Sequence, residues 1–98
     1  MNGGFVYIMT NKSNAVLYTG VTSDLQTRVM QHKNEFYPTS FTAKYKCHKL
    51  LYFEEFDDIE SAIAREKYIK GKKRIFKLEL ITSVNPGFND LWKLIKDW

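Results

Sequence analysis

A glutamate interrupts the apolar face of one expected helix. Between Asp58 and Lys70, apolar residues recur at the i, i+3, i+4 spacing of a helix that buries one side, and Glu66 falls on that side. The apolar positions are Ile59, Ala62, Ile63 and Ile69. A carboxylate there is costly unless it is paired, hydrogen-bonded or bound to a metal. Glu66 is therefore a candidate for an ion pair or for a metal ligand.

An arginine and a histidine occupy a similar position on another expected helix, which runs to about Lys33. Leu25 and Val29 mark its inward side, and Arg28 and His32 flank that side. The spacing leaves two interpretations open. In one, Arg28 forms a buried ion pair with the glutamate of the other helix, or the long side chains reach the rim of the core. In the other, both charges line a cleft, where the carboxylate holds a cation and the guanidinium faces an anion.

Two tyrosines are expected to face each other across a hairpin. Residues 5–10 (FVYIMT) and 16–21 (VLYTGV) are rich in β-branched and aromatic residues, and the turn residues 11–14 separate them. Symmetric pairing about this turn predicts Tyr7 directly opposite Tyr18 on one face. Gly20, two residues beyond Tyr18, leaves room on the same face. That room indicates either a β-bulge or a gap where a phosphate approaches the backbone.

The elements that must position these residues follow from the rest of the pattern. Residues 34–46 are expected to form a loop, 48–56 a third strand, and 74–82 a helix that Asn85-Pro86-Gly87 ends. Ser23 or Asp24 can cap the first helix, Asp57 or Asp58 the second, and Asn89 a last helix over 90–98. The predicted order is ββαβααα. This order favours an α+β fold, in which helices flank a three-stranded antiparallel sheet.

Composition limits the classes of protein. The chain has 98 residues, of which 44% are apolar, so we expect residues 1–98 to form a single domain. One cysteine, Cys47, excludes an intrachain disulfide, and with only two histidines the chain cannot be a typical zinc finger. The sequence has no long apolar stretch, so we expect no membrane segment, no secretory signal and a cytoplasmic location.

The positive charge is concentrated in one segment. The net charge is +4, and between Arg65 and Lys77 the chain carries seven bases against a single acid, Glu66. Some of these bases suit the carboxyl end of a helix, but their number exceeds that need. The segment is compatible with a polyanionic partner.

Several of these residues together resemble a known motif. Val6-Tyr7-Ile8 and Tyr18-Thr19-Gly20 are similar to the two half-motifs of the GIY-YIG nuclease superfamily, although Val6 and Thr19 replace a glycine and an isoleucine. Arg28, His32 and Glu66 match the family's arginine, histidine and metal-binding glutamate in order. Asn85 is similar to a late asparagine of many members, although an Asn-Pro turn needs no function to explain it. The chain most resembles short stand-alone bacterial members that are similar to the nuclease domain of the excision-repair incision subunit.

The resemblance implies a metal-dependent endonuclease. Its catalytic residues would be Tyr7, Tyr18, Arg28, His32, Glu66 and Asn85. Glu66 would be the one protein ligand of a Mg²⁺ or Mn²⁺ ion that stabilises the leaving 3′ oxygen. Arg28 would grip the scissile phosphate, and Tyr7 would orient or deprotonate the attacking water. Tyr18 and His32 would position water or phosphate.

The expected partner is a nucleic acid, with DNA favoured over RNA. Gly20 and the bases Lys70, Lys72, Lys73 and Arg74 would contact its backbone without reading sequence. One alternative is a nucleic-acid-binding module without catalysis, which uses the same basic surface. Another is a structural domain in which Arg28 and Glu66 form a salt bridge.

Overall fold

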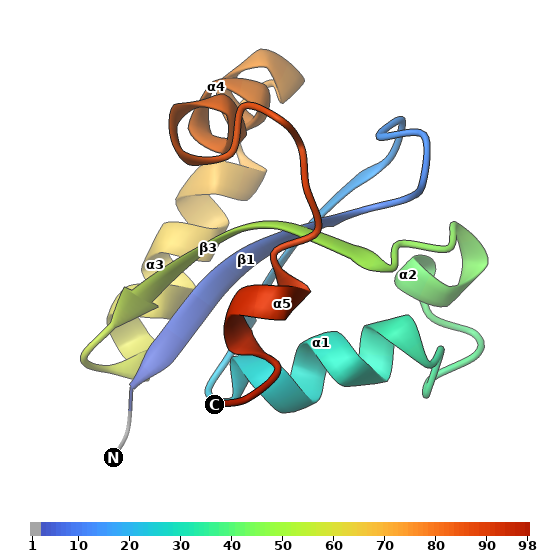
Figure 1. The fold of residues 1–98 in the computed structure, drawn as a ribbon. Helices are drawn as coiled ribbons and strands as arrows, with labels where there is room; N and C mark the ends of the chain where they lie inside the picture. Colours follow the sequence, from blue (N-terminus) through green and yellow to red (C-terminus); the bar gives the residue numbers. More distant parts are fainter. Residues whose placement is uncertain (1–2) are drawn as a thin grey trace.

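A computed structural model describes residues 3–98 and shows an α+β fold built on a three-stranded antiparallel sheet of order β2-β1-β3 (Figure 1). The predicted fold class is confirmed. The elements are β1 (Gly4–Thr10), β2 (Leu17–Thr22), α1 (Leu25–Lys33), α2 (Phe41–Lys44), β3 (Lys49–Phe56), α3 (Ile59–Lys70), α4 (Arg74–Val84) and α5 (Trp92–Ile95).

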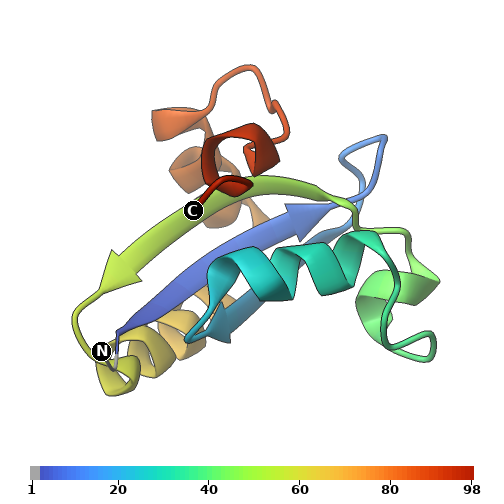
Figure 2. The same cartoon turned by 60° about the horizontal axis from the view of Figure 1, so that its bottom comes forward.

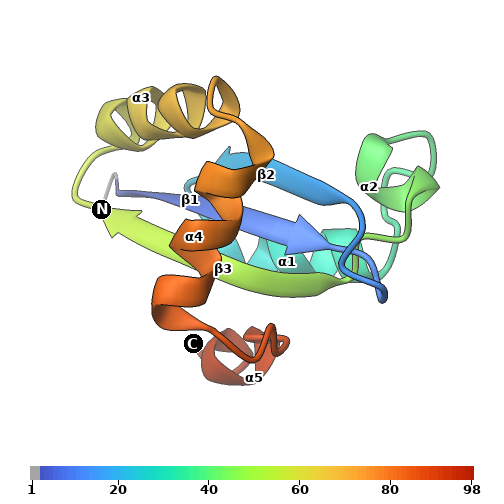
Figure 3. The ribbon, with the colours of Figure 1, turned by 90° about the horizontal axis from the view of Figure 1, so that it is seen from above.

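Helices cover both faces of the sheet, so the central strand β1 is buried on both sides. Tyr7 and Met9 point toward α1 and α5, where they form a cluster with Leu25, Val29 and Ile95. Val6 and Ile8 belong to the opposite face, which α3 and α4 cover. Figures 2 and 3 show α1 on one side of the sheet and α4 crossing the other. A strand covered on both faces reads as a continuous apolar run, as FVYIM does.

The hairpin register differs from the prediction by two residues. Tyr7 pairs with Gly20, and Tyr18 pairs with Met9, so the tyrosines are diagonal neighbours. The reason is a longer loop: the side chain of Asn11 accepts hydrogen bonds from the backbone N–H groups of residues 15 and 16, which keeps both residues out of the strand. An even shift preserves the faces, so the two tyrosines still share one face of the sheet.

Compared with the sequence prediction, the structure has one additional helix and one shorter helix. Ser40 caps the short helix α2 inside the segment predicted to be a loop, because its hydroxyl accepts from the N–H of Ala43. The expected last helix over 90–98 is only one turn, Trp92–Ile95. Asn89 does not cap it, because the helix begins only at Trp92 and its N-cap position is Leu91, which makes no side-chain cap hydrogen bond. Asp24 and Asp58 cap α1 and α3, as two of the sequence alternatives predicted.

Candidate functional site

The ring of Tyr7 lies across the edge strand β2 at Gly20. A Cβ built on Gly20 would be 2.5 Å from the ζ-carbon and the hydroxyl oxygen of Tyr7. Glycine is thus required for the ring to pass. Both predicted explanations of Gly20 are wrong here: the β1–β2 register continues regularly through it, and the ring, not a phosphate-sized gap, occupies the space. The tyrosine hydroxyl thereby lies against the edge strand β2, where it is buried.

A hydrogen-bond chain begins at this hydroxyl. The oxygen of Tyr7 is 2.8 Å from Nε2 of His32, and Nδ1 of His32 is 2.8 Å from Oγ1 of Thr42. Burial and, to a smaller extent, the positive charge of Arg28 together lower the pKa of His32 to about 4. The imidazole is therefore neutral at pH 7, with one ring nitrogen available as an acceptor.

The other candidate residues surround Tyr7. Its ring centroid is 6.2 Å from that of Tyr18, which is 5.5 Å from the ring of His32. Burial is the main cause that raises the pKa of the Tyr7 hydroxyl, and the charge of Glu66 adds to it, whereas the charge of Arg28 opposes it. Both charged residues are thus near enough to influence the tyrosine hydroxyl electrostatically, Arg28 through a side-chain hydrogen bond as well as through its charge. The structure thus brings five of the predicted catalytic residues together.

Glu66 is buried on α3, and its ion-pair partner is Lys70, one turn further along the same helix. Nζ of Lys70 is 2.8 Å from the Glu66 carboxylate, and the lysine side chain is half-exposed. Within residues 3–98, Arg28 forms no ion pair with a carboxylate. The interpretation as a buried Arg28–Glu66 salt bridge is therefore wrong, and the guanidinium remains available for an anion.

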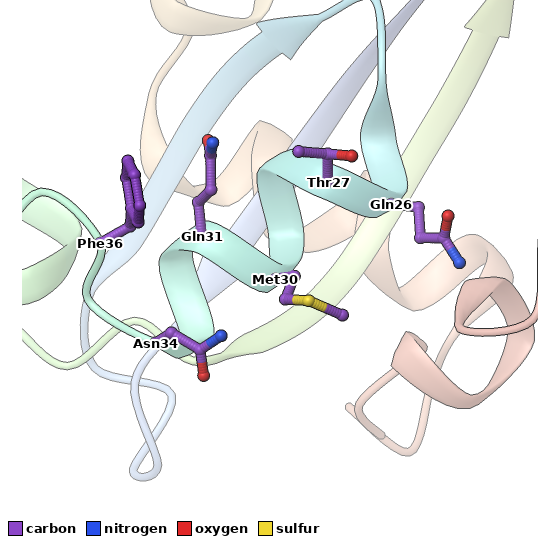
Figure 4. A pocket seen from close by; sticks show the side chains of 6 residues that line it. All are labelled: Gln26, Thr27, Met30, Gln31, Asn34 and Phe36. Carbon is purple, nitrogen blue, oxygen red and sulfur yellow. The ribbon is translucent and has the colours of Figure 1, made fainter.

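An open cavity of about 300 Å³ adjoins the cluster. Two of its walls are aromatic and two of its lining side chains are lysines; the residues are Leu17, Tyr18, Thr19, Phe41, Lys70 and Lys77. A larger cavity of about 390 Å³ lies along the outer side of α1 (Figure 4) and contains none of the predicted site residues. Its lining is formed by Gln26, Thr27, Met30, Gln31, Asn34 and Phe36.

Asn85 does not join the cluster, which corrects its predicted catalytic role. Its side-chain nitrogen donates to the carbonyls of Leu51 and Asn89, and its oxygen accepts from the N–H of Asn89. Leu51 belongs to β3, which forms the opposite edge of the sheet from β2. The asparagine therefore ties the end of α4 to β3, which is a structural task.

The residues of the basic run make different contacts. Lys70 lines the cavity, while Lys72 lies over the ring of Tyr68, with 4.5 Å from Nζ to the centroid. Arg74 donates to the backbone carbonyl of Asn14 in the hairpin loop. Lys73 is exposed at the start of α4. Of the four bases predicted to contact the nucleic-acid backbone, Lys70 is the one that lines this cavity.

Three residues beside the candidate site were not predicted from the sequence. Thr42 and Phe41 lie in the segment expected to be a loop, where Ser40 before an apolar residue was the one available signal of a helix. Lys77 belongs to the recognised basic run, but helical spacing alone does not show that it reaches the same cavity as Lys70.

Residues 3–79 match the GIY-YIG catalytic domain family. The chain belongs to the GIY-YIG family. It is similar to a UPF0213 protein of Syntrophus aciditrophicus, with 34% identity over 86 residues that cover 88% of this chain and 97% of the relative. A UPF0213 protein of Clostridium perfringens is 40% identical over 79 residues, which cover 81% of this chain and 83% of the relative. The family match ends before Asn85.

The fold also has a solved counterpart. The solution NMR structure of the UPF0213 protein BH0048 from Bacillus halodurans superposes with a TM-score of 0.57 at 25% sequence identity, covering 95% of this chain and 97% of that chain. No helix within residues 3–98 of this GIY-YIG protein has the length and apolar character needed to cross a membrane.

Proposed function

We propose that this GIY-YIG protein is a metal-dependent endonuclease that hydrolyses nucleic-acid phosphodiester bonds, with DNA as the favoured polymer. The observation that carries the proposal is the grouping of Tyr18, His32, Arg28 and Glu66 around the Tyr7 hydroxyl. Family membership makes a nucleic acid the expected class of substrate. The grouping supplies a proton-transfer chain, a guanidinium that has no carboxylate partner within the described residues, and a carboxylate, all within one small region.

The hydrogen-bond chain can activate a water molecule. Tyr7 alone cannot act as a phenolate base near neutral pH, because burial raises the pKa of its hydroxyl and keeps it protonated. A water bound to that hydroxyl could transfer a proton to the tyrosine oxygen while the tyrosine passes its own proton to Nε2 of His32. This requires the Nδ1 proton to point toward Thr42, which the contact with Oγ1 allows. The phenol then relays a proton without ionising first.

Arg28 couples substrate binding to this relay. Its positive charge lowers the pKa of His32 in the substrate-free protein. A phosphate on the guanidinium would offset that charge, so the pKa of His32 would rise and the imidazole would accept a proton more readily. The same guanidinium would stabilise the negative charge that develops on the phosphate oxygens.

Glu66 fits a divalent cation that keeps most of its water. Within the described part of the chain, no cluster of three or more His, Cys, Asp or Glu side chains could form an all-protein cage. Mg²⁺ does not need one, since one or two carboxylates plus substrate oxygens and waters suffice. When bound, the ion would supply positive charge to the leaving 3′ oxygen. Lys70, half-exposed, could then leave Glu66 and contact a neighbouring phosphate.

The test is a cleavage assay with the purified chain. Labelled single-stranded, duplex and branched DNA, together with RNA of the same sequences, are incubated with Mg²⁺, with Mn²⁺ or with EDTA. The proposal predicts cuts in at least one DNA with either cation and none with EDTA. Binding to these nucleic acids without any cut under any condition would instead support the non-catalytic binding module.

A further inference from the structure

Three aromatic rings, those of Tyr18, Phe41 and Tyr45, lie in a row that starts at the candidate site. The ring of Phe41 lies 5.9 Å from that of Tyr18 with 29° between the planes, and 4.7 Å from the ring of Tyr45. Phe41 and Tyr45 are 46% and 40% exposed; Phe41 begins the one-turn helix α2 and Tyr45 directly follows it, and the buried residues Thr42 and Ala43 hold the helix in place. Large aromatic side chains on an anchored element offer ring surface to a partner at little entropic cost.

Positive charges accompany these rings. Lys70 and Lys77 line the same cavity as Tyr18 and Phe41, and Nζ of Lys70 is 6.0 Å from the Tyr18 ring centroid. On the outer side, Nζ of Lys44 is 5.3 Å from the Tyr45 ring centroid. Rings that alternate with lysines match the alternation of bases and phosphates along a nucleic-acid strand.

Exposed aromatic rings suit unpaired nucleotides better than paired ones. In a duplex, both faces of each base are covered by neighbouring bases, and only the base edges can be contacted in the grooves. A phenyl ring has no hydrogen-bonding group to read an edge, but it stacks well on a free base. The rings therefore match a base that has left its stack.

We propose that Phe41 and Tyr45 form a stacking platform for an unpaired nucleobase, while Lys70 and Lys77 contact the adjoining phosphates. This rests on the proposed function and deepens it. The substrate class is a strand with unpaired nucleotides at the point of cleavage, such as a single-stranded tail or flap. Because stacking on a ring does not select one base, recognition depends on strand state more than on sequence.

The test compares two DNAs of the same sequence, a blunt duplex and a duplex with a single-stranded tail. Binding is measured by fluorescence anisotropy in EDTA, so that it does not depend on cleavage. Phe41→Leu keeps an apolar side chain but removes the ring, and Phe41→Tyr restores a ring. Phe36→Leu is the matched control, because Phe36 is exposed on the preceding loop but lines the other cavity. Circular dichroism verifies that each variant is folded.

We expect the wild type to bind the tailed duplex more tightly. Phe41→Leu should weaken binding of the tailed duplex by about 5- to 150-fold, the range of one base–aromatic stack. Phe41→Tyr and Phe36→Leu should keep the preference. Equal affinity of the wild type for both DNAs, equal losses in Phe41→Leu and Phe36→Leu, or no binding to either DNA would overturn the proposal. Self-association that Phe41→Leu abolishes, without any preference for the tail, would assign the rings to a protein contact instead.

The same DNAs with Mn²⁺ separate this inference from the proposed function. If the wild type prefers the tail but cuts neither DNA, the platform stands and the nuclease activity fails. If it cuts the blunt duplex as fast as the tailed one, the nuclease activity stands and the platform fails.

Discussion

The two edges of the sheet both bury polar side chains, but they satisfy them differently. At the β3 edge, the side chain of Asn85 makes its hydrogen bonds to the backbone of residues 51 and 89. Beside it, Asp90 accepts from the backbone N–H of Leu50 and Trp92 and pairs with Lys33 at 2.5 Å. Each polar group there has a partner that also connects two elements, so this edge is built for stability.

At the β2 edge, some charged groups lack a partner that holds them inside the fold. Tyr7 and His32 are joined in a closed chain, but the carboxylate of Glu66 has a half-exposed lysine as its partner, and Arg28 has no carboxylate partner within the described residues. The comparison teaches that burial of a polar residue does not by itself indicate a site. A site is indicated where buried or half-buried charges lack partners that fix them inside the fold.

Among the variants that test this difference between the two edges, Arg28→Ala is expected to have the largest effect. Loss of a guanidinium that acts mainly in the transition state should lower kcat by about 10²–10³-fold. The free energy of unfolding should change by less than about 1 kcal/mol, because no ion pair inside the protein is broken. Cleavage of a labelled substrate and urea unfolding measure both quantities.

The matched control is Arg65→Ala. Arg65 also carries a guanidinium on a helix, but this group donates hydrogen bonds to the carboxylate of Glu54 at 3.0 Å. This variant should lose stability and keep kcat. Normal cleavage by Arg28→Ala would remove the arginine from the proposed mechanism.

The opposite result is expected at the β3 edge. Asn85→Ala removes three hydrogen bonds from a buried site and should lower the free energy of unfolding by about 3 kcal/mol, at about 1 kcal/mol for each bond. At a temperature where the variant is fully folded, its kcat should equal that of the wild type. An Asn85→Ala protein with wild-type stability and no cleavage would return the asparagine to the active site.

A smaller effect is expected from pH. The folded pKa of His32, about 4, lies below its ordinary value of 6.5, so the unfolded chain binds the proton first as pH falls. The stabilisation from neutral His32 is complete above pH 6.5 and declines toward pH 4, with a loss of about 2 kcal/mol between pH 7.5 and 5. Urea unfolding across this range should show that slope in the wild type and lack it in His32→Gln. Equal slopes in the two proteins would mean that His32 is not held neutral.

Much of the fold could be predicted from the sequence because local signals agree with the tertiary structure. The three strands and the caps Asp24 and Asp58 follow from residue type and spacing. The hairpin register could not be predicted, because it depends on how the Asn11 side chain holds the loop, which adds two residues to the connection. Helix α2 was missed because one turn is too short to produce a periodic pattern.

Five residues of the candidate site could be predicted from the sequence, but their pairings could not. Glu66 and Arg28 stand out because each charge falls on or beside an apolar face, and the structure places both close to Tyr7. Which cation pairs with Glu66 depends on three-dimensional distance, and the lysine one helical turn away forms the pair. Asn85 shows the converse: its sequence context resembles a functional residue, while its contacts are structural.

The most direct test of the open β2 edge is a comparison of wild type with Glu66→Gln. The variant keeps the shape of the side chain and removes its charge. With Mn²⁺ the wild type should cut a tailed DNA and the variant should not, under any divalent cation.

Without metal, the variant should bind that DNA at least as tightly, because a charge that repels phosphate is gone. It should also melt near the wild-type temperature, since Lys70 is half-exposed and can be solvated once its partner is lost. A Glu66→Gln protein that melts far below a wild type unable to cut any nucleic acid would contradict the account, because Glu66 would then serve the fold alone.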